Sequence, residues 1–166
     1  MIFMAVGTQF PFDRLVTYMD EWAKQHEEPV IAQIGDGNYR PKHMQFERFM
    51  DGGSYNDNIR QATVFVSHAG MGNIISAKEL GTPIIVINRQ FKLGEHRNDH
   101  QADGLKWMGK LEGVYAASNQ DELYHHLGTI LSGNKTTAAD TQPPQKSDGH
   151  LAISHYIADF ILTGQR

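Results

Sequence analysis

The stretch from Val64 to Gln101 constrains the fold of this chain more than any other part of the sequence. Thr63–Ser67 predicts a buried strand, and a glycine-rich turn that carries His68 follows it at once. Asn73–Leu80 then predicts a helix, and Ile84–Ile87 predicts a second buried strand before a polar loop. α/β proteins hold phosphate groups where a strand ends in a small-residue turn that opens a helix. The order therefore predicts a parallel α/β sheet with a ligand site at the carboxyl ends of its strands.

The rest of the chain repeats this alternation of short apolar runs and stretches with helical spacing. Nearly all of the expected strands are continuously apolar, which is typical of a parallel sheet covered by helices on both faces. We therefore expect one Rossmann-like domain over residues 1–131. Its other strands are expected at Ile2–Val6, Val30–Ile34, Phe46–Met50 and Gly113–Ala117, and its other helices between Pro11 and Ala23 and at Asn56–Ala62, Asp99–Lys110 and Asn119–Leu131. The last of these helices has Asn119 as its expected N-cap and Glu122 in the capping-box position.

The alternation stops after Leu131. Residues 132–149 are small, polar and poor in apolar side chains, which predicts a flexible linker. Residues 150–166 resume helical periodicity, and Ile153, Ile157 and Phe160 fall on one face of an amphipathic helix. Two interpretations stay open: this helix packs on its own domain, or it docks on a partner.

Composition excludes several classes of function. The chain has 166 residues, no cysteine and a formal net charge of −4. The absence of cysteine removes disulfides, thiolate metal sites and a cysteine nucleophile, and it fits a reducing cytoplasm. The acidic balance argues against a nucleic-acid partner, which would need a basic face. No apolar run approaches the roughly 18 residues needed to span a bilayer, so we expect a cytoplasmic protein that reaches a membrane only through another molecule.

The glycine-rich turn is the first candidate binding element. The N–H groups and the dipole at the start of the helix after it favour a bound anion, and glycines there let a backbone approach a ligand or adopt positive φ. The imidazole of His68 can donate to a phosphate oxygen, whereas the alternative is a plain tight turn that this histidine caps. The turn contains Ser67, His68, Ala69, Gly70, Met71, Gly72 and Asn73, and at the end of the first strand Gly7 and Thr8 belong to the same predicted sheet edge.

The polar loop after Ile87 is the second candidate. Its segment Gly94–Gln101 concentrates hydrogen-bonding side chains and contains no hydrophobic one. Such side chains are costly to bury unless each is paired, so the segment is either solvated or a binding surface. Arg89 and Arg97 are candidates to hold a phosphate or a carboxylate on a sugar. The other candidate ligand contacts are Glu95, His96, Asn98, Asp99, His100 and Gln101.

A metal site is the rival interpretation of this loop. His96 and His100 stand four residues apart and would share a helix face. Glu95 precedes the first histidine, so the HExxH pattern is not met, and no third ligand is evident. No metal is predicted.

Taken together, these motifs resemble the C-terminal, donor-binding half of GT-B glycosyltransferases of family 28, over residues 1 to about 130. Within that family the chain is most similar to the small soluble subunit of two-part UDP-sugar transferases. These include the eukaryotic enzyme that adds the second GlcNAc to dolichol-linked sugar and bacterial pairs that add glucuronosyl or galactosyl residues to exopolysaccharide or capsule. The matching elements are Val6-Gly7-Thr8, Gln33-Ile34-Gly35-Asp36-Gly37, Ser67-His68-Ala69-Gly70-Met71-Gly72, Gly81-Thr82-Pro83 and Gly94-Glu95-His96-Arg97-Asn98-Asp99-His100-Gln101.

The resemblance implies a function and a partner. The turn from His68 to Asn73 would take the diphosphate of a UDP-sugar, which is the donor substrate rather than a cofactor, and His100 and Gln101 would contact the sugar. His68 would be the catalytic residue, in an inverting transfer without a metal. A membrane-anchored partner subunit would bind the lipid-linked saccharide acceptor and recruit this chain to the inner face of the membrane.

One position departs from the family pattern. Many GT-B enzymes carry a ribose-binding glutamate five residues before the glycine of the G-x-P turn, where this chain has Ser76. Glu79 lies about 4.5 Å farther along the helix axis and is a poor substitute. This departure keeps open a non-catalytic nucleotide-sugar-binding regulatory module, while a sugar-nucleotide epimerase is disfavoured because such enzymes need both domains.

Overall fold

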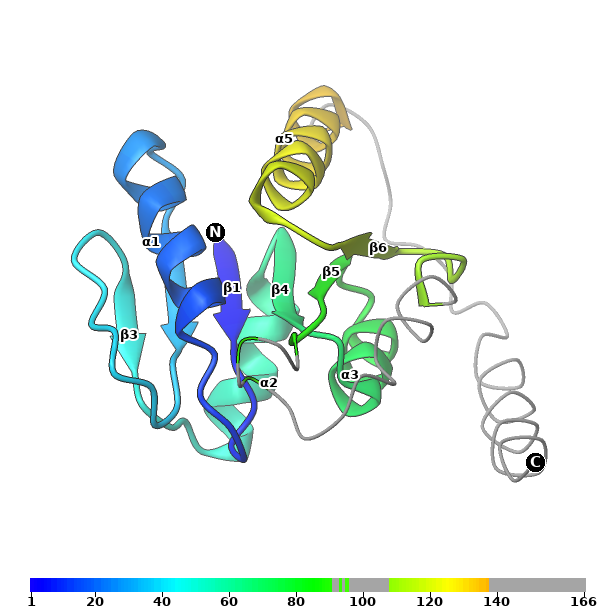
Figure 1. Ribbon diagram of the computed structural model, residues 1–166. Coiled ribbons are helices and arrows are strands. Elements are labelled where there is room, and N and C mark those ends of the chain that lie inside the picture. Colours follow the sequence, from blue (N-terminus) through cyan, green and yellow to red (C-terminus); the bar gives the residue numbers. More distant parts are fainter. Residues whose placement is uncertain (91–92, 94, 96–107, 138–166) are drawn as a thin grey trace, which may run out of the picture. The chain divides into compact units, whose positions relative to one another are not determined.

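In the computed structural model the chain forms a six-stranded sheet in the order β3-β2-β1-β4-β5-β6 (Figure 1). All neighbouring strands pair in parallel. The structure describes residues 1–90, 93, 95 and 108–137. The strands are β1 Ile2–Ala5, β2 Val30–Gln33, β3 Gln45–Glu47, β4 Val64–His68, β5 Ile84–Ile87 and β6 Val114–Ala117. The expected parallel α/β architecture is confirmed, and the strand order reverses direction between β1 and β4, where open α/β sheets bind their ligands.

Helices cover both faces of the sheet (Figure 1). Alternate residues of β1 explain why the strand is apolar throughout: Ile2 and Met4 face one core, while Phe3 and Ala5 face the other. The first core is closed by helices α1 (Asp13–Gln25) and α5 (Gln120–Thr137), and the second by α2 (Gly52–Gln61) and α3 (Met71–Leu80). Residues 1–136 thus form one compact unit.

Strand β3 is shorter than the sequence predicts and starts one residue earlier. It is the exposed edge of the sheet, and all three of its residues are exposed. Backbone hydrogen bonds continue just beyond it, since the N–H of Gly35 donates to the carbonyl of Arg48 at 2.9 Å, whereas the N–H of Met50 donates to the side-chain oxygen of Gln33 at 2.9 Å. The expected strand Phe46–Met50 is replaced by Gln45–Glu47.

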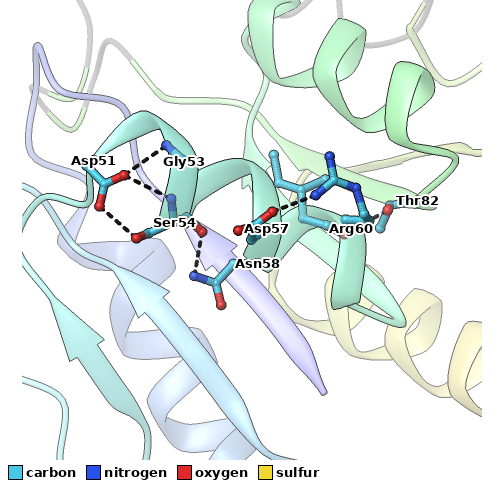
Figure 2. Close-up of polar contacts among 8 residues, drawn as sticks. Asp51, Gly53, Ser54, Asp57, Asn58, Arg60 and Thr82 are labelled. Carbon is cyan, nitrogen blue, oxygen red and sulfur yellow. Dashed lines mark hydrogen bonds and ion pairs between the residues drawn. The ribbon is translucent and has the colours of Figure 1, made fainter.

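Helix α2 begins at Gly52, four residues before the predicted start at Asn56. Figure 2 shows the reason: the Asp51 carboxylate accepts from the backbone N–H groups of Gly53 at 2.9 Å and Ser54 at 3.0 Å. This N-cap offsets the poor helix propensity of two consecutive glycines. The signal was present in the sequence, since aspartate is a favoured cap.

The ends of α3 and α5 test two further expectations. Helix α3 ends where predicted, at Gly81 in the left-handed conformation with φ 73°. The expected N-cap of α5 is confirmed, because the Asn119 side chain accepts from the N–H of Glu122 at 2.9 Å. That helix continues six residues beyond Leu131, to Thr137, because adding a residue to a formed helix costs far less than starting one.

The expected helix between Pro11 and Ala23 is confirmed as α1, which starts at Asp13 and extends to Gln25. The expected helix Asp99–Lys110 lies mostly outside the described residues, and the helix of residues 150–166 lies wholly outside them. The division into a domain, a linker and a terminal helix therefore stays a prediction. Across the described ranges, no helix is both long enough and apolar enough to cross a bilayer.

Candidate functional site

A cavity of about 380 Å³ lies at the carboxyl ends of β1, β4 and β5. This is the edge where the strand order reverses, as the sequence predicts. The cavity collects predicted site residues from three separate loops, together with two neighbours that the sequence analysis did not choose, Gln9 and Phe10. It is lined by Gly7, Thr8, Gln9, Phe10, His68, Gly70 and Arg89.

The imidazole of His68 is enclosed by two glycines. A Cβ atom added at Gly7 would lie 2.9 Å from the Cε1 atom of His68, and one added at Gly70 would lie 2.6 Å from its Nε2 atom. Real Cβ atoms do not approach other atoms so closely, so both positions must stay without a side chain for the ring to occupy this place. Gly70 has an ordinary φ of −111°. The sequence analysis assigned it positive φ or contact with a ligand, but its observed contribution is room for the histidine.

A chain of hydrogen bonds fixes the side chains behind His68. The buried Ser67 hydroxyl donates to the carbonyl of Ala5 at 2.8 Å and therefore has only acceptor capacity left. Asn73 must then turn its amide nitrogen to Ser67, and Nδ2 lies 2.6 Å from Oγ. The Asn73 carbonyl oxygen in turn accepts from the Tyr55 hydroxyl at 3.0 Å. Burial raises the pKa of the Tyr55 phenol, which keeps this donor protonated.

This series of hydrogen bonds bears on which ring nitrogen of His68 carries a proton. Its Nδ1 atom lies 3.5 Å from Asn73 Nδ2 and 3.4 Å from Ser67 Oγ. An amide nitrogen only donates, so the contact with Asn73 favours an Nδ1 atom that accepts and a proton on Nε2. The Ser67 hydroxyl, whose proton goes to Ala5, instead accepts from a protonated Nδ1. The Nε2 atom is the one beside Gly70 and therefore lies next to the start of α3.

The N-terminus of α3 provides the second attractive element for an anion. Gly70 is its N-cap residue, no side chain caps the helix, and its first turn holds no acidic residue. The partial positive charge at a helix start and its N–H groups favour negative ligands. A Cβ at Gly72, in this first turn, would meet no atom within 4 Å. The start of α3 and the Nε2 atom of His68 thus lie at the same place.

Arg89 supplies a positive charge from the loop after β5. The residue is 5% exposed, and its guanidinium lies over the rings of Phe10 and Phe12 at 5.9 and 5.2 Å. Desolvation by burial lowers its pKa, although the nearby Glu95 charge acts in the opposite direction. Among the described residues that line the cavity, Arg89 and His68 are the two whose side chains can carry a positive charge.

Glu95 is engaged by the protein itself. Arg14 of α1 holds its carboxylate in a two-pronged contact, with Nε–Oε1 at 2.9 Å and Nη2–Oε2 at 2.8 Å, and the backbone N–H of Gln90 donates to Oε2 at 2.8 Å. This predicted donor contact therefore ties the loop after β5 to α1. Whether Glu95 also touches a ligand stays a prediction.

Of the other predicted site residues, the structure describes some, while the rest lie outside the described ranges. Ala69 is buried and its N–H donates to the carbonyl of Ile87 at 2.9 Å, while Thr8 is exposed at the cavity and Met71 is half-buried in the first turn of α3. His96, Asn98, Asp99, His100 and Gln101 lie outside the described residues. Within the described ranges, no group of three or more histidine, aspartate or glutamate side chains could hold a metal ion.

Comparison with known families gives one match over most of the chain. The model of the glycosyltransferase family 28 C-terminal domain matches residues 1–155. A mouse protein, UDP-N-acetylglucosamine transferase subunit ALG13, is 30% identical over 121 residues, which cover 59% of this chain and 10% of that protein. The chain thus spans about a tenth of the length of this relative.

Solved structures share the fold. The NMR solution structure of ALG13 matches with a TM-score of 0.54 and 14% identity, covering 93% of each chain. The calicheamicin glycosyltransferase CalG4 matches with a TM-score of 0.54 and 11% identity, over 81% of this chain and 35% of that one. The kitacinnamycin glycosyltransferase matches with a TM-score of 0.52 and 18% identity, over 80% and 35%. The fold is therefore that of the C-terminal half of a GT-B enzyme.

Proposed function

Since the chain belongs to glycosyltransferase family 28, whose C-terminal domain it matches over residues 1–155, we propose that its cavity binds a UDP-sugar donor. The observation that supports this most directly is the placement of His68. Gly7 and Gly70 leave just enough room for its ring, and Nε2 lies beside the uncapped start of α3. A diphosphate set there would meet a helix dipole, the imidazole of His68 and the charge of Arg89.

The proposed reaction transfers the sugar to a hydroxyl group of the acceptor. A bond forms between the acceptor oxygen and the anomeric carbon, and the bond from that carbon to the β-phosphate oxygen breaks, with inversion at the anomeric carbon. The electron pair leaves with UDP, and a base takes the acceptor proton. Donors already aimed at the developing negative charge stabilise the transition state more than the ground state. His68 Nε2 and the start of α3 would have this role.

We further propose that the chain is the donor-binding and catalytic subunit of a two-part transferase. A full GT-B enzyme closes two domains over its substrates, and residues 1–136 make one compact unit of this kind. The mouse relative is itself described as a transferase subunit. The partner would be membrane-anchored, bind a lipid-linked saccharide and hold this chain at the cytoplasmic face of the membrane. Bacterial exopolysaccharide synthesis is the process we propose for the pair.

Calorimetric titration tests the donor site. The intact chain should bind UDP with a dissociation constant between micromolar and millimolar, and GDP should give no heat. His68→Gln should weaken UDP binding by about tenfold, the effect of one lost hydrogen bond to a charged group. Exposed His125 on α5 offers a matched control, and His125→Gln should bind like the wild type. Equal binding of UDP by the wild type and His68→Gln would contradict the proposal.

Ser76 supports one alternative, a non-catalytic nucleotide-sugar sensor. The residue occupies the middle of α3, where family 28 enzymes commonly place a ribose-binding glutamate. Co-expression with candidate membrane partners separates the two functions. Sugar transfer that requires His68 supports the catalytic subunit, whereas UDP binding without transfer in any pairing favours the sensor.

A further inference from the structure

Arg89 is a buried cation that has no hydrogen-bonded counter-charge among the residues that the structure describes. Its Nε atom is buried and has no hydrogen-bond partner, and no hydrogen bond or ion pair joins its guanidinium to another residue of the described ranges. The rings of Phe10 and Phe12 hold it in place through their faces, which is weak compensation for lost water. Burying a charge without a paired counter-charge is costly, so such groups are rarely kept without a reason.

Arg14 is a close structural comparison. Its guanidinium lies over the same Phe12 ring, also at 5.2 Å, but it is paired with the Glu95 carboxylate and donates to the carbonyl of Asn88 at 2.8 Å. The Oε2 atom of Glu95 also accepts from the N–H of Gln90. Among the described residues, Glu95 is therefore paired with Arg14 and not with Arg89, which lies at the cavity wall.

The Arg89 guanidinium and the start of α3 lie at the same cavity. Gly70, the N-cap residue of α3, and Arg89 both line it, and they come from the loops after neighbouring strands β4 and β5. A helix start attracts one anionic group, and a guanidinium with unused donors binds an oxyanion through paired hydrogen bonds. The cavity therefore offers positions for two negative groups of one ligand.

From this arrangement we propose that Arg89 forms a second oxyanion subsite, which binds a negative group of the donor other than the one at the start of α3. The inference rests on the proposed UDP-sugar site and deepens it. Two sources have the required chemistry: the second phosphate of the diphosphate, or a carboxylate on the transferred sugar. In the second case the donor is a UDP-uronic acid, and Arg89 is the residue that selects it.

Titrations of wild type and Arg89→Met with UDP, UDP-glucose and UDP-glucuronate distinguish the sources. A loss of affinity of about tenfold or more for all three ligands assigns Arg89 to the diphosphate. A loss confined to UDP-glucuronate assigns it to a sugar carboxylate. Arg89→Met affinities within twofold of the wild type for all three would overturn the subsite. Arg60→Gln removes an exposed arginine of α2 and controls for the change in net charge.

Thermal unfolding without ligand checks that the guanidinium is kept for binding rather than for stability. Arg89→Met removes a buried charge that has no counter-charge among the described residues, so this variant should melt at or above the wild-type temperature. Arg14→Met leaves the buried Glu95 carboxylate without its partner, so it should melt at a lower temperature. If Arg89→Met melts as low as Arg14→Met, the guanidinium is structural and the subsite is wrong.

The failure of the UDP-sugar proposal is recognisable separately. If wild type binds none of the three nucleotides, that proposal fails, and inorganic pyrophosphate becomes the probe. Pyrophosphate binding that Arg89→Met loses would retain the oxyanion subsite without a nucleotide. No pyrophosphate binding by the wild type would overturn the subsite as well.

Discussion

The side chains of Asn73 and Ser67 are joined by a 2.6 Å hydrogen bond in which the amide can only be the donor. The Ser67 hydroxyl is already committed to the carbonyl of Ala5, so the amide of Asn73 has one possible orientation. That orientation directs its nitrogen at His68 Nδ1. We therefore predict that Asn73 is a positioning residue, which acts on a ligand by favouring a proton on His68 Nε2.

Asn73→Ala should therefore change the state of His68 without removing it. We expect UDP binding to weaken by about tenfold, since the Nε2 donor is no longer enforced. The ¹⁵N chemical shifts of the His68 ring, assigned by comparison with His68→Gln, report the tautomer directly. They should show Nε2 protonated in the wild type and a mixture in the variant. Asn56→Ala, at an exposed position of α2, is the matched control. Identical ring shifts in wild type and Asn73→Ala would refute the positioning role.

Gly70→Ala should displace His68, because the new methyl group would lie 2.6 Å from Nε2. The ring has to leave its place between the glycines, so UDP affinity should fall about as far as in His68→Gln. Gly128→Ala is a suitable control: it adds a methyl group in α5 where nothing lies within 4 Å. Better helix propensity should stabilise that variant by up to about 1 kcal/mol and leave UDP binding unchanged. Calorimetry and urea unfolding of both variants measure the two effects.

Asp20 should make stability depend on pH. Its buried carboxylate accepts from the N–H groups of Lys42 at 2.9 Å and His43 at 2.7 Å and from the Tyr39 hydroxyl at 2.8 Å. Desolvation alone would raise its pKa, but these hydrogen bonds together lower it below the ordinary value of 3.8. The stabilisation is then complete above about pH 4 and is lost as the pH falls through the lowered value.

Asp20→Asn tests this assignment. The amide retains one acceptor oxygen and turns a donor toward groups that also donate, so we expect a loss of about 2–3 kcal/mol at pH 7. The wild type should lose stability between pH 4 and pH 2 more steeply than the variant. Asp57→Asn, at an exposed position of α2, should show neither effect. Urea unfolding across this pH range measures both effects. If the free energy of unfolding falls equally steeply with pH in the wild type and in Asp20→Asn, the assignment is contradicted.

The sequence predicted the parallel sheet well because the signal is local and redundant. A strand such as β1 must be apolar on both faces to lie under two helix layers, and the turn after β4 carries its glycines in sequence. The placement of Gly7 and Phe10 beside His68 was harder to foresee in detail, since it depends on which strands become neighbours. The start of α2 was missed because one capping side chain outweighed two glycines.

The roles of Glu95 and Arg89 lay beyond the sequence for a different reason. Both are charged residues of one polar loop, and their order along the chain does not say which is paired. The partner of Glu95 is Arg14, which is 81 residues away. Only the packing of α1 against this loop shows that, within the described part of the chain, the Glu95 carboxylate is paired with Arg14 and the Arg89 guanidinium has no such partner.

The Arg14–Glu95 pair gives the last prediction. Both side chains are largely buried, at 14% and 10% exposure, so removing one partner leaves a charge without compensation. Glu95→Gln should destabilise the protein by about 3 kcal/mol, and Arg14→Met by a similar amount. The double variant should cost clearly less than the sum, because neither charge is then left alone. Additive losses in urea unfolding would mean that the two side chains stabilise the loop independently. The coupling matters for function, since the pair holds the loop that carries Arg89 to the cavity.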